Sequence, residues 1–191
     1  KAKTVATSDN SVATATTTSK AIASQHTISV QQLAKNHTML SNTVVASDTS
    51  LASALGEGEK VFSVTINGTA TEGTVDVAAG DTNEEIMRNV ASALNDAFDA
   101  VEYDEEEEED EESNRVNASY VADTSSTGKL VFTSKLTGLE NKMQLADVSG
   151  GLLAALGIDN ESVAYNESSG TGGYLYEDSK LDAKIVFNGI S

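Results

Sequence analysis

The chain has 191 residues, of which 39% are hydrophobic and only 5% aromatic, and it lacks tryptophan, so its core must be built from Val, Ile, Leu and Ala. This length allows one large or two small domains. The formal net charge is −18, of which Glu102 and residues 104–112 supply ten negative charges, leaving −8 for the remainder. Such an acidic surface argues against nucleic acids and anionic membranes as partners.

Three absences narrow the class of protein further. Without cysteine the chain cannot form disulfides, use a thiolate in catalysis or bind zinc through Cys ligands. No run of about 18 apolar residues is present, so no membrane span is predicted. Residue 1 is Lys rather than Met, and no basic and then apolar leader follows it, so we expect an internal fragment.

The N-terminal quarter of the chain shows only weak structural signals. Residues 3–24 are rich in Ala, Thr, Ser and Val, which predicts an extended arm or part of a larger unit. Residues 26–33 alternate as a short strand. Residues 48–50 are predicted to cap a short helix over 51–55, and the Gly-rich residues 56–59 form a flexible joint.

The strongest signals predict a β-hairpin followed by a helix. Residues 62–66 alternate apolar and polar, Asn67-Gly68 is typical of a tight turn, and residues 74–77 form the return strand. Thr82 and Glu85 then match a capping box at a helix start. Apolar residues follow at helical spacing, namely Ile86, Val90, Ala93, Leu94, Ala97 and Phe98.

A second hairpin is predicted beyond the helix. The acidic run 102–112 comes first and should be an exposed, mobile loop, because dense like charges repel one another. Residues 116–120 and 130–134 then alternate on either side of a turn at 125–128. We therefore expect a strand-rich α+β fold containing a ββαββ unit, in which one helix packs across a single antiparallel sheet of four strands.

The C-terminal part carries shorter elements. Residues 143–145 are predicted to form a short edge strand, and residues 152–156 a brief apolar helix. Residues 159–173 are polar and Gly-rich and should form a long loop. Residues 181–189 alternate and end in Asn-Gly, much like residues 62–68, so we expect the first strand of a further hairpin there.

These elements suggest three parts. Residues 1–56 would be an N-terminal arm and part of a neighbouring domain, and residues 59–157 the ββαββ domain with its acidic loop at 102–112. Residues 158–191 would be a loop and the first strand of a following domain.

Several of these segments resemble a known family. Residues 27–34, followed by 39–41, resemble the N-terminal segment of flagellar hook-associated protein 2, the filament cap family, in which a short strand leads into Gln-Leu-Ala and then Ser. Residues 64–68, 93–97 and 128–138 are similar to a repeat that recurs in exposed domains of flagellins and cap proteins.

The resemblance extends over roughly residues 24–190, because residues 151–157 and 182–190 also match the cap family. The order of the motifs carries it, since hairpins with Asn-Gly are common. This sequence departs from the family in two ways. The acidic run replaces a short loop between helix and strand, and the terminal coiled-coil segments of axial flagellar proteins are not seen.

The resemblance implies a structural protein rather than an enzyme. Such a protein is exported through the flagellar type III channel without a cleavable signal peptide and lies outside the cell at the filament tip. It assembles with itself into a ring and guides flagellin into place, with other hook-associated proteins as further partners. The resemblance implies no catalytic residue, no cofactor and no metal site.

Two alternatives remain open. One is an outer domain of a flagellin, which would need long flanking helices. The other is a Ca²⁺-dependent surface adhesin that binds host surface glycans, suggested by the acidic run and the polar loops. An uninterrupted acidic run favours a solvated loop or weak cation binding over a defined Ca²⁺ site.

No other residues predict chemistry. His26 and His37 are the only imidazoles, and neither has a His or Cys neighbour at ligand spacing, so both are interpreted as surface or strand-edge residues. Residues 123–128 share only Asp at the first position and Gly at the sixth with an EF-hand loop, and they are interpreted as a turn.

Overall fold

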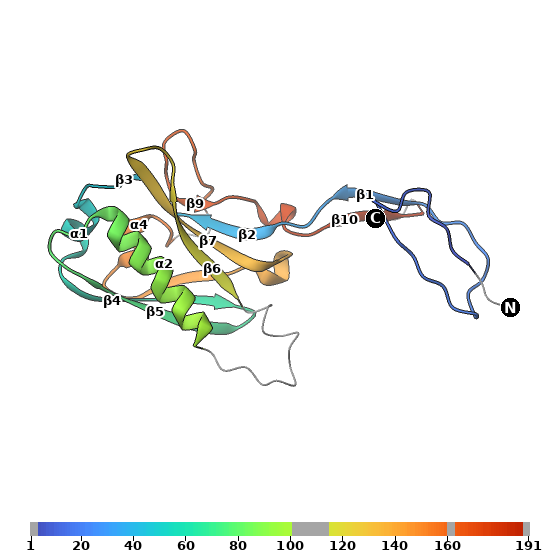
Figure 1. The fold of residues 1–191 in the computed structure, drawn as a ribbon, viewed down its shortest axis with the longest axis horizontal. Coiled ribbons are helices and arrows are strands. Elements are labelled where there is room, and N and C mark those ends of the chain that lie inside the picture. Colours follow the sequence, from blue (N-terminus) through green and yellow to red (C-terminus); the bar gives the residue numbers. More distant parts are fainter. Residues whose placement is uncertain (1–3, 101–114, 160–162, 189–191) are drawn as a thin grey trace.

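The computed structural model describes residues 4–100, 115–159 and 163–188 (Figure 1). Within these ranges the strands form three antiparallel sheets with the orders β1-β10, β5-β4-β8 and β3-β7-β2-β9, and β6 pairs with β7 in the last of these. The strands are β1 (Ile28–Gln32), β2 (Asn36–Leu40), β3 (Val44–Val45), β4 (Gly58–Ile66), β5 (Thr69–Val77), β6 (Val116–Ala122), β7 (Thr127–Thr137), β8 (Gln144–Ser149), β9 (Gly173–Tyr174) and β10 (Lys184–Phe187).

One long helix and several short helical segments accompany the sheets. They are α1 (Ser50–Leu55), α2 (Asn83–Asp99), α4 (Leu152–Leu156) and the 3-10 turns η1 (Leu139–Asn141) and η2 (Asp178–Lys180). The capping box predicted for α2 is confirmed. The Glu85 N–H donates to Thr82 Oγ1 at 3.2 Å, and the Thr82 N–H donates to Glu85 Oε2 at 2.9 Å.

The first predicted hairpin is confirmed as β4 and β5. Its turn residues Asn67 and Gly68 have φ angles of 50° and 79°, as a tight hairpin turn requires. Phe62 lies directly opposite Gly73 in the ladder. A Cβ atom added at position 73 would lie 2.4 Å from Phe62 Cζ, so the ring occupies the space that any larger residue would need.

The second hairpin, β6 and β7, is also confirmed, but the expectation of one four-stranded layer is wrong. The two hairpins lie in different sheets. The edge of β4 opposite β5 is taken by β8, and the edge of β7 opposite β6 is taken by β2 and β3. The strand-rich α+β class is confirmed, with two sheets in place of one.

Helix α2 packs against one strand from each hairpin, β5 and β6, and Figure 1 shows it lying across both. Its predicted stripe is buried, since Ile86, Val90 and Leu94 are each 0% exposed. Phe62 from β4 and Phe132 from β7 meet edge to face, with ring centroids 6.5 Å apart. The helix therefore closes a single core that both sheets share.

Two asparagines tie α2 to its neighbours. Asn83 is fully buried, and its Oδ1 accepts the Leu51 N–H of α1 at 2.9 Å while its Nδ2 donates to Val45 O at 2.9 Å. The helix over 51–55 is thus confirmed, but no side chain within residues 48–50 caps it. A residue more than thirty positions away supplies that hydrogen bond instead.

Asn95 performs a similar role on the open edge of β6. Its Nδ2 donates to Ala118 O at 2.9 Å, and its Oδ1 accepts the Ala118 N–H at 3.0 Å. The Ala118 N–H and C=O point away from β7, so without a partner they would be buried and unpaired. The amide side chain thus takes the place of a neighbouring strand at this residue.

Strand β2 was not predicted from the sequence, and it contains His37. The expectation of a surface or strand-edge histidine is wrong here, because His37 is only 1% exposed and β2 lies between β7 and β9. The Met143 N–H donates to His37 Nδ1 at 3.3 Å, which leaves the proton of the neutral ring on Nε2. Burial lowers the pKa of His37 to about 4, and the charge of Lys142 acts in the same direction against that of Asp178.

The ends of the chain differ from expectation at one point. Strand β10 does not begin a further hairpin within the described residues but pairs with β1, Ile28 lying opposite Phe187. Strands β2 and β3 join the same sheet as the second hairpin, across the predicted joint at 56–59. The division into parts at 1–56, 59–157 and 158–191 stays a prediction, and the acidic run 102–112 lies outside the described residues.

Replacing Asn95 by Ala should destabilise the protein by about 1–3 kcal/mol, because the Ala118 N–H and C=O lose their partners in a buried position. Asn89, which is exposed on the same helix, is the matched control, and Asn89→Ala should change stability by less than about 0.5 kcal/mol. Urea denaturation measures both. Equal effects of the two substitutions would contradict the proposed edge protection.

Acid should destabilise the protein through His37. Because its folded pKa of about 4 lies below the ordinary 6.5, the unfolded chain takes up the proton first, and stability is lost as the pH falls through this interval. The loss approaches about 3 kcal/mol. His37→Gln keeps an acceptor for the Met143 N–H without titrating, so its stability should fall less steeply over the same interval. Parallel pH profiles of the two proteins in urea denaturation would contradict this.

Candidate interaction surface

Strands β1 and β10 form a two-stranded ribbon that extends from one end of the body (Figure 1). Ile28 pairs with Phe187 and Val30 with Ile185. Residues directly opposite each other in an antiparallel pair share a face, so these four side chains point the same way. They are 44%, 46%, 38% and 52% exposed in that order. The ribbon therefore presents a half-exposed apolar face, which is the candidate contact surface.

The outer end of the ribbon is held together by His26 and Asn188. The His26 ring stacks on Phe187 with centroids 5.0 Å apart, and its Nδ1 lies 2.9 Å from Asn188 Nδ2. Asn188 has a φ of 51°, and its Oδ1 accepts the Thr27 N–H at 2.9 Å. His26 thus lies at the surface as predicted, and its contacts order the end of the ribbon.

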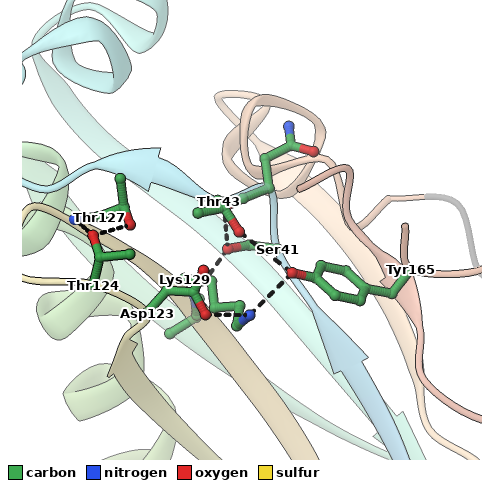
Figure 2. A network of polar contacts seen from close by, with 9 residues as sticks. Ser41, Thr43, Asp123, Thr124, Thr127, Lys129 and Tyr165 are labelled. Atoms are coloured by element: carbon green, nitrogen blue, oxygen red, sulfur yellow. Dashed lines mark hydrogen bonds and ion pairs between the residues drawn. The ribbon is translucent and has the colours of Figure 1, made fainter. Parts of the chain in front are cut away.

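A polar network joins three segments of the body, namely the chain before β3, the turn between β6 and β7 with the start of β7, and the loop after α4 (Figure 2). Lys129 Nζ donates to Asp123 Oδ1 and to Tyr165 Oη, both at 3.0 Å, and Tyr165 Oη lies 3.4 Å from Thr43 Oγ1. Burial lowers the pKa of Lys129, but these hydrogen bonds outweigh it, so the pKa lies above its ordinary value. The network fastens the loop after α4 to the five-stranded sheet and keeps Lys129 charged.

Residues 123–126 form the turn between β6 and β7, as predicted, whereas 127 and 128, which were expected to belong to it, are the first residues of β7. The Thr124 hydroxyl accepts the N–H groups of Ser126 at 3.2 Å and Thr127 at 3.0 Å. The Asp123 carboxylate is engaged by Lys129. Among the residues that the structure describes, no three His, Asp or Glu side chains are grouped as metal ligands. The expectation that the acidic run is a solvated loop, or binds cations weakly, rather than forming a defined Ca²⁺ site stays a prediction, since that run lies outside the described residues.

Hydropathy gives one further result. Of the helices in the described ranges, none is both long and apolar enough to cross a membrane.

Comparison with known proteins gives a family match at the N-terminal end of the chain. Residues 1–37 match the family described as the flagellar hook-associated protein 2 N-terminus. This stretch contains the arm, β1 and the start of β2, and it includes the segment 27–34 on which the resemblance was first based. Comparison with curated proteins finds no match to this sequence.

Solved structures share the fold of nearly the whole chain. The D2-D3 domains of the flagellar cap protein FliD from Escherichia coli align with a TM-score of 0.59 and 23% identity, covering 92% of this chain and 76% of that one. The D2-D3 domains from Serratia marcescens give a TM-score of 0.58 at 18% identity, covering 92% and 79%.

A longer Escherichia coli structure of domains D1-D2-D3 gives a TM-score of 0.54 at 21% identity, covering 90% of this chain and 44% of that one. This chain thus spans less than half of that longer relative. The resemblance to flagellar hook-associated protein 2 is therefore confirmed, by a family match over residues 1–37 and by a cap-protein fold over most of the chain.

Proposed function

We propose that this chain is a structural part of the flagellar filament cap and promotes the assembly of flagellin at the filament tip. One observation carries the proposal: the same chain matches the hook-associated protein 2 N-terminal family over residues 1–37 and has a fold similar to that of cap proteins. The outer domain of a flagellin is not favoured, because the solved structures described above that share this fold are cap proteins.

The architecture suits a protein that acts through its shape. Strand β1 leads into the body and β10 leads out of it, and the two strands pair with each other. The rest of the fold is therefore a lobe that is connected through this one ribbon (Figure 1). Subunits of this kind can form a ring by head-to-tail contacts, in which one surface of each subunit binds a different surface of the next. Weak contacts repeated in this way sum to a stable assembly.

The partners follow from this role. The chain would bind copies of itself in the ring, flagellin beneath it and other hook-associated proteins. It would reach the outside of the cell through the flagellar export channel without a cleaved signal peptide. Its role needs no catalytic group, and the network around Lys129 is accounted for by holding a loop in place.

The adhesin alternative depends on the acidic run and on Ca²⁺. Calorimetric titration of the chain with Ca²⁺ distinguishes the adhesin hypothesis from the filament cap hypothesis. A saturable heat together with a raised melting temperature would favour the adhesin, whereas a flat trace would remove it.

The test of the proposal is complementation. The full-length protein that contains this chain should restore filament growth to a strain lacking its own cap, and electron microscopy should show a ring at the filament tip. A matched variant with Leu94→Asp, which places a carboxylate in the fully buried stripe of α2, should not restore growth, because it unfolds the body. Strictly monomeric protein at high concentration, together with failure to restore filaments, would overturn the proposal.

A further inference from the structure

The ribbon meets the body at two crossing segments, residues 33–35 and 181–183, which are tied to each other. The Lys35 N–H donates to Leu181 O at 2.8 Å. The side chain of Leu181 is 0% exposed, so this end of the link is anchored in the body rather than lying on its surface. A bond between the two segments alone would still let the ribbon swing as one unit.

Gln32, the last residue of β1, adds a second tie. Its Nε2 donates to Ser179 O at 3.0 Å and to Asp182 O at 2.7 Å. One amide group thereby holds the root of β1 to the turn η2 and to the segment that leads into β10. Both donors of the amide nitrogen are used, which fixes the orientation of the side chain.

A third segment of the body braces both crossing segments. Asp182 Oδ1 accepts the Leu139 N–H at 2.6 Å, and Lys35 O accepts the Gly138 N–H at 3.0 Å. Gly138 has a φ of 105°, a backbone conformation that favours glycine. The Lys35 ammonium also lies 5.5 Å from the centre of the Tyr176 ring.

These contacts come from three parts of the body, namely η2 with Ser179, residues 138–139 and Tyr176, and they hold the crossing segments from different sides. Two short linkers without such ties would form a hinge, because a few loop residues can absorb large changes in φ and ψ. We propose that Gln32 and Asp182 lock the ribbon to the body, so that the junction is a rigid strut that sets the direction of the lobe. This inference does not depend on the proposed function.

Electron spin resonance distance measurements can test the strut, because the chain has no cysteine and introduced cysteines are labelled uniquely. One nitroxide pair, at Ser29→Cys and Thr74→Cys, spans the ribbon and the body, where both residues are exposed. A second pair, at Thr74→Cys and Asn89→Cys, lies within the body and reports its integrity. In the otherwise unchanged 191-residue chain, both pairs should give narrow distance distributions.

Gln32→Glu removes the two amide donors, and Asp182→Ala removes the acceptor for the Leu139 N–H. Each should broaden the distribution of the ribbon-to-body pair and shift its mean, and the double variant should do so most, while the pair within the body stays narrow. Asp182→Asn keeps a carbonyl oxygen and should retain the narrow distribution. Gln144→Glu makes the same chemical change at an exposed position of β8 and should have no effect.

A broad ribbon-to-body distribution in the unchanged chain would overturn the proposal. It would also be overturned if Gln32→Glu and Asp182→Ala left the distribution as narrow as Gln144→Glu does. Broadening of both pairs in Asp182→Ala would point to loss of the body fold, in which case Gln32→Glu, whose side chain lies at the root of the ribbon, decides.

Discussion

The structure depends on the burial of one face of α2 between two hairpins that do not pair with each other. Ile86, Val90 and Leu94 contribute side chains that are completely withdrawn from water, each worth about 1.5–3 kcal/mol relative to exposure. The Phe62 and Phe132 rings meet in the same core, one from each sheet. The helix and the facing sheet together cover the apolar face of each sheet.

Hydrogen bonding in this fold relies on side chains where the backbone ladder ends. Asn83 completes the start of α1 and reaches Val45, and Asn95 satisfies the outer edge of β6. Both asparagines belong to α2, so the helix whose apolar side chains cover the core also provides hydrogen bonds to unpaired backbone groups of its neighbours. An open strand edge invites pairing with other chains, and covering it favours a defined single fold.

The sequence predicts the local elements well and their association poorly. Both hairpins, the capping box at Thr82 and the buried stripe of α2 rest on signals within a few residues, such as alternation, Asn-Gly turns and helical spacing. The partner of a strand edge has no such signal. Strand β2 carries polar residues on both sides of His37, so nothing in its pattern indicated a central strand or a buried imidazole. The candidate contact face on the ribbon was equally hidden, since Phe187 gains its neighbour Ile28 from the other end of the chain.

The pairing of β1 with β10 also has a consequence for the order in which the protein folds. These strands lie about 160 residues apart in sequence, and bringing such distant segments together carries the largest loop-closure entropy in the molecule. Hairpins such as β4 and β5 close over two residues and form early. The body should thus form before the ribbon, and the apolar face that Ile28, Val30, Ile185 and Phe187 share would arise only when folding is nearly complete.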